Sequence, residues 1–285
     1  MTAVESVTVL SHARPEETGP ALHTLVAVAR ERSVIVRLDR DETRKYDVAR
    51  GDGVELDAPV ADDVGLCVAL GGDGTILRAL RRYAGTGVPV FAVNYGQVGF
   101  LATVDPGEDL ARAFELALSG RFETLSLPAI EAQTAEGPTR AINDLAIHRR
   151  IGERVAELGY SINGEEVGSV RSDGLVLATP AGSTGYNLAN GGPVMAWGVE
   201  GFAVSFIAPH SLTARALVVA PDDEVSVHNR SGGSVDVTLD GRPAGELGPG
   251  HSITACYRRD AAKLAQVPGS SFYRRLRDKF GRLAA

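Results

Sequence analysis

Apolar runs and helical spacing alternate along the first third of the chain. The predicted strands are residues 6–10, 34–38, 64–70 and 88–93. The predicted helices between them are residues 16–32 and 75–83, where apolar residues recur every three or four positions. Near-continuous apolar strands that alternate with helices are typical of a parallel sheet covered on both faces.

From about residue 122 the pattern changes to period two, with turn residues at short intervals. Apolar side chains alternate with polar or small ones at 125/127, 158/160/162, 225/227 and 235/237/239. Ser231-Gly-Gly separates the last two of these runs and predicts a hairpin between them. The pattern therefore predicts a second, antiparallel β-rich domain.

The tail at residues 271–280 has the spacing of a short amphipathic helix. Phe272, Leu276 and Phe280 share one face, which we expect to pack back on the first domain, with the arginines in solvent. The expected division is an α/β domain at 1–102, to which 268–285 return, and a β-rich domain at 103–267.

Composition and charge narrow the classes of partner. Hydrophobic residues make up 44% and charged residues 23% of the 285, as in an ordinary globular protein, and the net charge is −7. This balance argues against nucleic acid or an anionic membrane as partner. No apolar run approaches a membrane span, and a cytoplasmic location is expected. Cys67 and Cys256 are too few for a disulfide framework and are expected to be inert core residues.

The stretch GGDGT at 71–75 carries the first sign of chemistry. It lies where a predicted strand ends and a predicted helix begins, an arrangement that binds phosphate because the helix N-terminus presents unpaired N–H groups. It fits neither the Walker lysine pattern nor G-x-G-x-x-G.

Asp73 is the unusual member of this stretch, because a carboxylate is repelled by phosphate. One interpretation is a chemical task, either as general base for an attacking hydroxyl or as a ligand of magnesium. The other is that Asp73 is simply a helix N-cap and the glycines form a tight turn.

Three later stretches favour a ligand site. NYGQVGFL at 94–101 follows the next predicted strand, so it is expected at the same carboxyl edge of the sheet. Asn143 and Asp144 precede a short apolar run. DGLVLATPAGSTGY at 173–186 opens from a strand into a loop of hydroxyls and glycines, which can bind ribose or phosphate through Ser183 and Thr184 and stack a ring on Tyr186.

These motifs, in this order, resemble those of the NAD kinases. The resemblance also includes GGP at 191–193 and APHSLTAR at 208–215, and extends from about residue 64 to the C-terminal helix. GGDGT alone also resembles phosphofructokinases and diacylglycerol-type lipid kinases. The implied fold is a Rossmann-like, phosphofructokinase-like α/β domain joined to the antiparallel domain.

The resemblance implies transfer of a phosphoryl group to the 2′-hydroxyl of the adenosine ribose of NAD, giving NADP. Asp73 matches the proton acceptor, Asn143 and Asp144 match the pair that holds adenine and ribose, and Phe100 would form an apolar wall for adenine. The residues implied to bind NAD are Asp73, Gly74, Phe100, Asn143, Asp144, Arg154, Arg171, Asp173, Ala181, Thr184, Gly185, Tyr186, Asn187, Leu188 and Ala189. The implied phosphate-donor loop is Gly71, Gly72, Gly74 and Thr75.

The implied phosphoryl donor is ATP or polyphosphate with Mg²⁺, whose ligands the motifs do not identify, and the implied assembly is a homodimer or homotetramer. Gly185 and Ala189 depart from the alanine and serine usual in the family. Two alternatives stay open. One is a kinase of another acceptor, such as a lipid or sugar phosphate, and the other is a non-catalytic dinucleotide-binding regulator.

Overall fold

The structure, a computed structural model, describes residues 4–46, 48, 50–51, 53–97, 99–134 and 137–281. The chain divides into two compact units. The first unit is Met1–Ser126 with Ala262–Ala285, and the second is Leu127–Ala261. The chain passes from one unit to the other twice, each time inside a long strand and not in a loop. These strands are β6 (Glu123–Thr134) and β17 (Ser252–Gln266).

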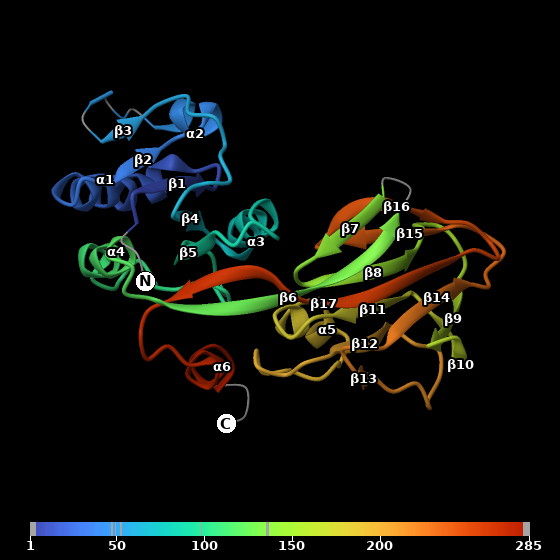
Figure 1. Ribbon diagram of the computed structural model, residues 1–285. Helices are drawn as coiled ribbons and strands as arrows, with labels where there is room; N and C mark the ends of the chain where they lie inside the picture. The colour runs from blue at the N-terminus through green and yellow to red at the C-terminus, as the bar shows by residue number, and fades with distance from the viewer. Residues whose placement is uncertain are drawn as a thin grey trace. The chain divides into compact units, whose positions relative to one another are not determined.

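The first unit contains a parallel sheet with the strand order β17-β5-β4-β1-β2-β3 (Figure 1). Its other strands are β1 (Ser6–Ser11), β2 (Ile35–Arg37), β3 (Val54–Glu55), β4 (Leu66–Gly71) and β5 (Pro89–Asn94). Every residue of β4 is buried, as its unbroken apolar sequence predicted. The predicted parallel α/β domain is confirmed.

Helices cover both faces of this sheet. Leu66, Val68 and Leu70 of β4 join a core with α1 (Pro15–Glu31) and α4 (Leu110–Leu118). Because strand side chains alternate, Cys67 and Ala69 face the opposite side, where α3 (Asp73–Arg82) packs on β4. The other helices of this unit are α2 (Arg40–Lys45) and α6 (Phe272–Phe280). None of the described helices is long and apolar enough to cross a membrane.

The two units divide the chain at 126/127 and 261/262, whereas the expected boundaries are at 102/103 and 267/268. Residues 103–126 belong to the first unit, because α4 follows β5 and buries Phe114 and Leu118 in the core beside α1. The expected β-rich domain at 103–267 included these residues, so this part of the division is corrected.

The second unit is a sandwich of two mainly antiparallel sheets. One has the order β13-β12-β11-β8-β15-β16, and the other contains β10-β9-β14-β17 with the β6–β7 pair. Leu158, Val225 and Ile253 from one sheet share a core with Ile147 and Val237 from the other. The strands are β7 (Gly137–Ala141), β8 (Asp144–Arg149), β9 (Ala156–Ile162), β10 (Glu165–Ser172), β11 (Gly174–Ala178), β12 (Phe202–Ile207), β13 (Leu217–Val219), β14 (Glu224–Asn229), β15 (Val235–Leu239) and β16 (Arg242–Leu247). The predicted antiparallel β-rich domain is confirmed.

The hairpin predicted at Ser231-Gly-Gly is wrong. β14 pairs with β9 and β17, whereas β15 pairs with β8 and β16 in the other sheet. The glycine-rich link therefore carries the chain from one layer to the next. The hairpin of this region is β15–β16, closed by Asp240 and Gly241, which both have positive φ.

The two cysteines differ in their surroundings. Cys67 is fully buried in β4, and this burial raises the pKa of its thiol, as expected for an inert core residue. Cys256 is only partly buried, and its thiol donates to Glu224 at 3.4 Å, so the expectation of a core position is wrong for it.

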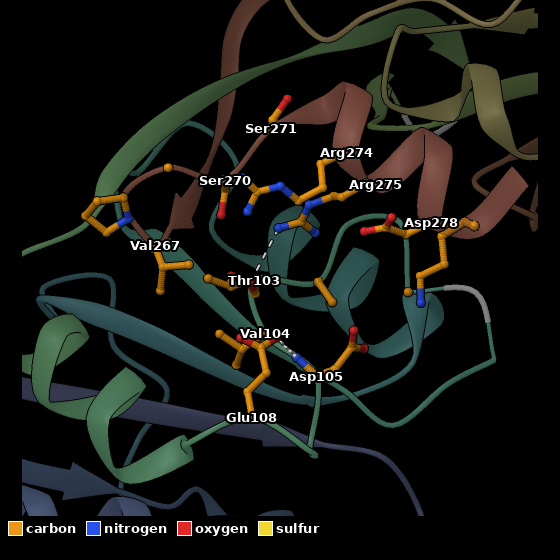
Figure 2. Close-up of a pocket in the computed structure, with 15 residues that line it drawn as sticks. Thr103, Val104, Asp105, Glu108, Val267, Ser270, Ser271, Arg274, Arg275 and Asp278 are labelled. Atoms are coloured by element: carbon orange, nitrogen blue, oxygen red, sulfur yellow. Dashed lines mark hydrogen bonds between the residues drawn. The ribbon is translucent and has the colours of Figure 1, made fainter. Parts of the chain in front are cut away.

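The C-terminal helix α6 packs on the first unit, as predicted. The ring of Phe100 contacts those of Phe272 and Phe280, with centroid distances of 5.6 and 5.7 Å. Arg275 points into the unit instead of into solvent, which corrects the expectation of a fully solvated basic face, and Figure 2 shows it directed toward Thr103. Arg282 lies outside the described residues.

Arg275 supplies hydrogen bonds to groups that the helix covers. Its guanidinium donates to the carbonyls of Phe100 and Thr103 at 3.3 and 3.4 Å and to Oε1 of Gln266 at 2.6 Å. Burial lowers its pKa, and the carboxylates of Asp105, Glu108 and Asp73 oppose that effect. In the sequence, Arg275 is one of several arginines in the tail and nothing distinguishes it from the others. In the structure, its hydrogen bonds make it part of the packing of α6.

Replacing Arg275 with methionine is expected to lower the free energy of unfolding by about 1–3 kcal/mol, because buried acceptors lose a charged donor while the side-chain volume is largely kept. Urea denaturation followed by circular dichroism measures this change. Arg274→Met is the matched control, since Arg274 is exposed on the same helix. Equal stability of the two variants would contradict a packing role for Arg275.

Candidate functional site

The turn at residues 71–75 is shaped by close packing of glycines. Gly72 is the N-cap of α3 and forms no side-chain cap, and a Cβ atom at Gly71 would lie 2.5 Å from Oγ1 of Thr75. A Cβ atom at Gly96 would lie 2.7 Å from the Cα of Gly72. Real Cβ contacts are longer, so the two backbones can meet only without side chains here. The turn and the loop at 94–101 are thereby packed together.

Asp73 is held by that neighbouring loop and not by its own helix. Its Oδ2 accepts from the N–H of Gly99 at 3.0 Å and its Oδ1 from the N–H of Leu101 at 3.4 Å. Since the N-cap is Gly72, the interpretation of Asp73 as a simple cap does not hold. Asp73 remains partly exposed, and Gly74 beside it is exposed.

The loop that holds Asp73 is itself fixed by Asn94. The Asn94 amide accepts from the N–H of Gly96 at 2.9 Å and donates to Asp105 at 2.7 Å. Gly99 has a φ of 61°, and a Cβ atom there would collide with the Asn94 side chain at 2.1 Å. The motif NYGQVGFL therefore has a structural reason for its Asn94, Gly96 and Gly99, while Val98 lies outside the described residues.

Phe100 is more enclosed than its expected role requires. Its side chain is 4% exposed, because α6 covers it. Little of the ring is free in this unit to form a wall for adenine, and that role stays a prediction. Phe100 lies between Gly99 and Leu101, whose N–H groups donate to Asp73. Its packing against α6 therefore supports the loop that holds the Asp73 carboxylate.

In the second unit, Asn143 and Asp144 lie at the start of β8. The Asn143 carbonyl accepts from the N–H of Thr179, and Thr179 Oγ1 donates to the carbonyl of Ile142 at 2.6 Å. Among the described residues, Oδ1 of Asn143 is buried without a hydrogen-bond partner. A buried, unpaired acceptor is costly and marks a place where a ligand can donate.

Asp144 has a strongly perturbed carboxyl group. It is 8% exposed, and desolvation together with the negative charge of Asp240 raises its pKa from 3.8 to about 7. No described residue donates a hydrogen bond to it in this structure. Buried carboxyls with shifted pKa values are concentrated at functional sites, so this finding supports the prediction that Asp144 binds ligand.

The hydroxyl-rich loop at 179–186 uses some of its polar groups internally. Ser183 is fully buried, donates to the Pro180 carbonyl at 2.8 Å and accepts from the N–H of Met195 at 2.9 Å. Asn187 is also fully buried and donates to the carbonyls of Ser183 and Pro193. The Ser183 hydroxyl is therefore used inside the loop, which corrects the expectation that it binds a ligand. The amide nitrogen of Asn187 is also used inside the loop, while its Oδ1 is buried without a partner among the described residues, and its role in binding NAD stays a prediction.

Other members of this loop reach the surface. Tyr186 is 37% exposed and its ring stacks on His148 with centroids 5.6 Å apart. Burial raises the pKa of Tyr186, and the charges of Asp144 and Asp173 raise it further, so the structure brings these three predicted residues together. Sequence reasoning missed His148, because its position in β8 gives no motif. The remaining predicted residues are the buried Ala181, the partly buried Thr184 and Leu188, and the exposed Gly185 and Ala189.

Arginines gather at a cavity of about 500 Å³ in the same unit. Arg154 and Arg171 both line it, as do Arg149 and Arg230. Asp173 approaches this cluster through Arg149, whose Nε lies 2.5 Å from Oδ1 of Asp173. The structure therefore places Arg154, Arg171 and Asp173, three of the residues implied to bind NAD, in one region of the second unit.

The predicted residues divide between the two units. Those of the first unit are Gly71, Gly72, Asp73, Gly74, Thr75 and Phe100, and those of the second run from Asn143 to Ala189. A parallel sheet whose glycine-rich turn carries a held carboxylate is followed in the chain by a β-sandwich with Asn143 and Asp144 at the start of a buried strand. This arrangement defines a class of two-domain kinases.

The comparisons with known proteins name the family within that class. Residues 23–122 match the ATP-NAD kinase N-terminal domain and residues 142–267 match the ATP-NAD kinase C-terminal domain. The NAD kinase of Lachnoclostridium phytofermentans is 36% identical over 234 residues, which cover 78% of this chain and 82% of that protein. The NAD kinase of Nitratidesulfovibrio vulgaris is 37% identical over 224 residues, 76% of this chain and 75% of that one. The chain belongs to the NAD kinase family.

Two solved structures establish the same fold. Yeast NADH kinase complexed with NADH aligns with a TM-score of 0.86 at 23% identity, covering 100% of this chain and 90% of that one. An NAD kinase from Archaeoglobus fulgidus in complex with ATP aligns with a TM-score of 0.70 at 23% identity, covering 98% of both chains.

Gly96→Ala is expected to lower kcat by at least about tenfold, because the new Cβ pushes the loop that holds Asp73 away from Gly72, and misplaced catalytic groups lose rate steeply. Steady-state kinetics of phosphorylation measure it. Gly107→Ala is the matched control, since a Cβ atom there meets nothing within 4 Å. A Gly96→Ala enzyme with the kcat of the control would show that this close approach does not matter.

Asp144→Asn is expected to raise Tm relative to the unaltered protein by several degrees more at pH 8 than at pH 5. The folded state binds the Asp144 proton more tightly than the unfolded state, so this carboxyl costs stability increasingly as pH rises from about 4 toward 7. The amide carries no such charge. Thermal unfolding at the two pH values measures the difference, with Glu165→Gln, at an exposed position of β10 in the same unit, as control. An identical shift at both pH values would argue against the raised pKa.

Proposed function

We propose that this chain phosphorylates the 2′-hydroxyl of the adenosine ribose of NAD to give NADP, with Asp73 as the proton acceptor. Family membership supports the reaction class. The single observation that carries the role of Asp73 is its carboxylate, oriented by the N–H groups of Gly99 and Leu101 at the carboxyl edge of the parallel sheet. Ligands of open α/β sheets bind at this edge.

Asp73 suits the chemistry that a ribose hydroxyl needs. Such a hydroxyl is a weak nucleophile near neutral pH, and a positioned base that takes its proton as the new P–O bond forms contributes about 10²–10⁴ in rate. Two N–H donors orient the Asp73 carboxylate, and its remaining lone pairs are directed away from them. The proton moves to Asp73 while the γ-phosphoryl group leaves its donor.

The second unit offers the acceptors that would hold the adenosine end. The unpaired Oδ1 of Asn143 can accept from an exocyclic amino group, and the Asp144 carboxylate can accept from ribose hydroxyls. Tyr186 presents one partly exposed ring face for stacking. The arginines at the cavity beside Asp173 would meet the negatively charged pyrophosphate that joins the two halves of the dinucleotide.

The donor phosphates would meet the backbone N–H groups at the start of α3. A helix N-terminus reached through glycines favours negative charge, which fits ATP or polyphosphate equally. Among the described residues no group of three or more His, Cys, Asp or Glu side chains could hold a metal ion. That fits Mg²⁺, which usually keeps several waters and binds through one or two carboxylates plus substrate phosphates. When bound, it would neutralise phosphate charge.

Two other functions keep the same fold. A lipid or sugar phosphate kinase would share the GGDGT turn, but it gives no reason for the unpaired Asn143 and the buried Asp144. A dinucleotide-binding regulator gives no reason to hold a carboxylate beside the phosphate turn. The cytoplasmic location and the homodimeric or homotetrameric assembly stay predictions.

Asp73→Asn is expected to fold and bind NAD but to lose phosphorylation by at least about a hundredfold, because an amide cannot accept the proton. NADP formation is followed with NAD, Mg²⁺ and either ATP or polyphosphate, and NAD binding by calorimetry.

Asp109→Asn is the matched control for this variant. Asp109 caps α4 in the same unit by accepting from the N–H of Arg112, and asparagine caps a helix equally well. Turnover near the control's level in Asp73→Asn would exclude Asp73 as proton acceptor. A purified protein that binds NAD but forms no NADP with either donor would favour the regulator.

A further inference from the structure

Asp240 lies in the turn between β15 and β16, and its side chain bonds outside that turn. Asp240 and Gly241 have φ values of 51° and 70°, the left-handed pair of a two-residue hairpin. Asn-Gly serves such a turn at least as well as Asp-Gly, because both residues tolerate this conformation. The turn itself therefore does not require a carboxylate at position 240.

The carboxylate of Asp240 accepts from three consecutive backbone N–H groups. The N–H of Ile142 lies 3.0 Å from Oδ2, and those of Asn143 and Asp144 lie 2.7 and 3.2 Å from Oδ1. In addition, the N–H of Asp240 donates to the carbonyl of Asp144 at 2.8 Å. Hydrogen bonds to an ionised acceptor are roughly twice as strong as neutral ones. The backbone that presents Asn143 and Asp144 is thus held from the side by one residue almost a hundred positions away in sequence.

The opposite side of the same backbone is held by Thr179. Its N–H donates to the Asn143 carbonyl and its hydroxyl to the Ile142 carbonyl. A Cβ atom at Gly182 would lie 2.1 Å from the Asn143 carbonyl oxygen, so the loop also presses against this segment. Residues 142–144 are therefore fixed on both sides before any ligand arrives, which reduces the entropy that binding must overcome.

The arrangement has an electrostatic cost. The negative charge of Asp240 adds to desolvation in disfavouring the ionised form of Asp144. A neutral asparagine at 240 would remove that repulsion, but its single oxygen cannot serve two separate groups of N–H donors and its NH₂ would face one of them. The carboxylate is therefore retained against a local penalty, which points to a benefit at Asn143 and Asp144.

We infer that Asp240 is a positioning residue for the dinucleotide, whose carboxylate fixes the backbone of residues 142–144 so that the side chains of Asn143 and Asp144 face the adenosine. The inference rests on the proposed function, because it gives Asp240 the task of positioning Asn143 and Asp144, the pair proposed to bind NAD. Asp240 does not itself touch the substrate and takes no part in proton transfer.

Asp240→Asn tests this role in the full-length enzyme. The KM for NAD is expected to rise by about tenfold or more, since each lost charge-assisted hydrogen bond weakens the geometry of the pair, while kcat stays within about threefold because Asp73 lies in the other unit. An unchanged KM would overturn the inference. A fall in kcat and in the unfolding midpoint without a selective rise in KM would also overturn it, since that is what a purely structural residue produces.

Two further variants separate the possible failures. Asp260→Asn is the matched control, because Asp260 is exposed in the same unit and also has a positive φ, 54°. Its KM is expected to equal that of the unaltered enzyme. Asn143→Ala tests the pair directly. If Asn143→Ala leaves the KM for NAD unchanged, the proposed binding role of the pair fails; if it raises KM but Asp240→Asn does not, only the positioning role fails.

Discussion

The packing of two backbones without side chains is the constraint on which the first unit depends. Gly72 and Gly96 approach so closely that neither position accepts a Cβ atom without a shift, and this approach brings the N–H groups of Gly99 and Leu101 to Asp73. Strand β4 and helix α3 set the direction of the turn, and Asn94 and α6 support the loop from behind. The carboxylate of Asp73 at a helix N-terminus is thus oriented by a second glycine-rich segment.

In the second unit, the main constraint is that the polar side chains of Asn143 and Asp144 lie inside a sandwich of two sheets. Asn143 and Asp144 stand at the start of a buried strand, where an unpaired oxygen and a desolvated carboxyl both destabilise the free protein. Backbone bonds to Asp240 and Thr179 offset part of that cost. Strain of this kind at a binding site is repaid when the ligand supplies the missing partners.

Local patterns predicted much of this architecture. The strands and helices predicted for the first unit appear within two residues of their expected bounds, since apolar runs and helical spacing are set by nearby residues. The short elements α2 and β3, and helix α4, were not predicted. The sequence could not show that β14 and β15 belong to different sheets, that Arg275 turns inward or that Asp240 reaches residues 142–144, because these are long-range pairings. The candidate site residues were predicted from the order of the motifs along the chain and from the residue types within them. Ser183, by contrast, has the residue type of a ligand contact, but its hydroxyl is used inside the loop.

The hydroxyl-rich loop separates residues that build it from residues that face outward. Ser183 and Asn187 are fully buried and cross-link the loop, whereas Gly185 and Ala189 are exposed. By the resemblance, these two exposed positions are among those that depart from the residues usual in the family. Mutations at the outward positions change the surface offered to a ligand without breaking an internal bond. The outer surface of the loop can therefore change during evolution while the hydrogen bonds that build the loop stay the same.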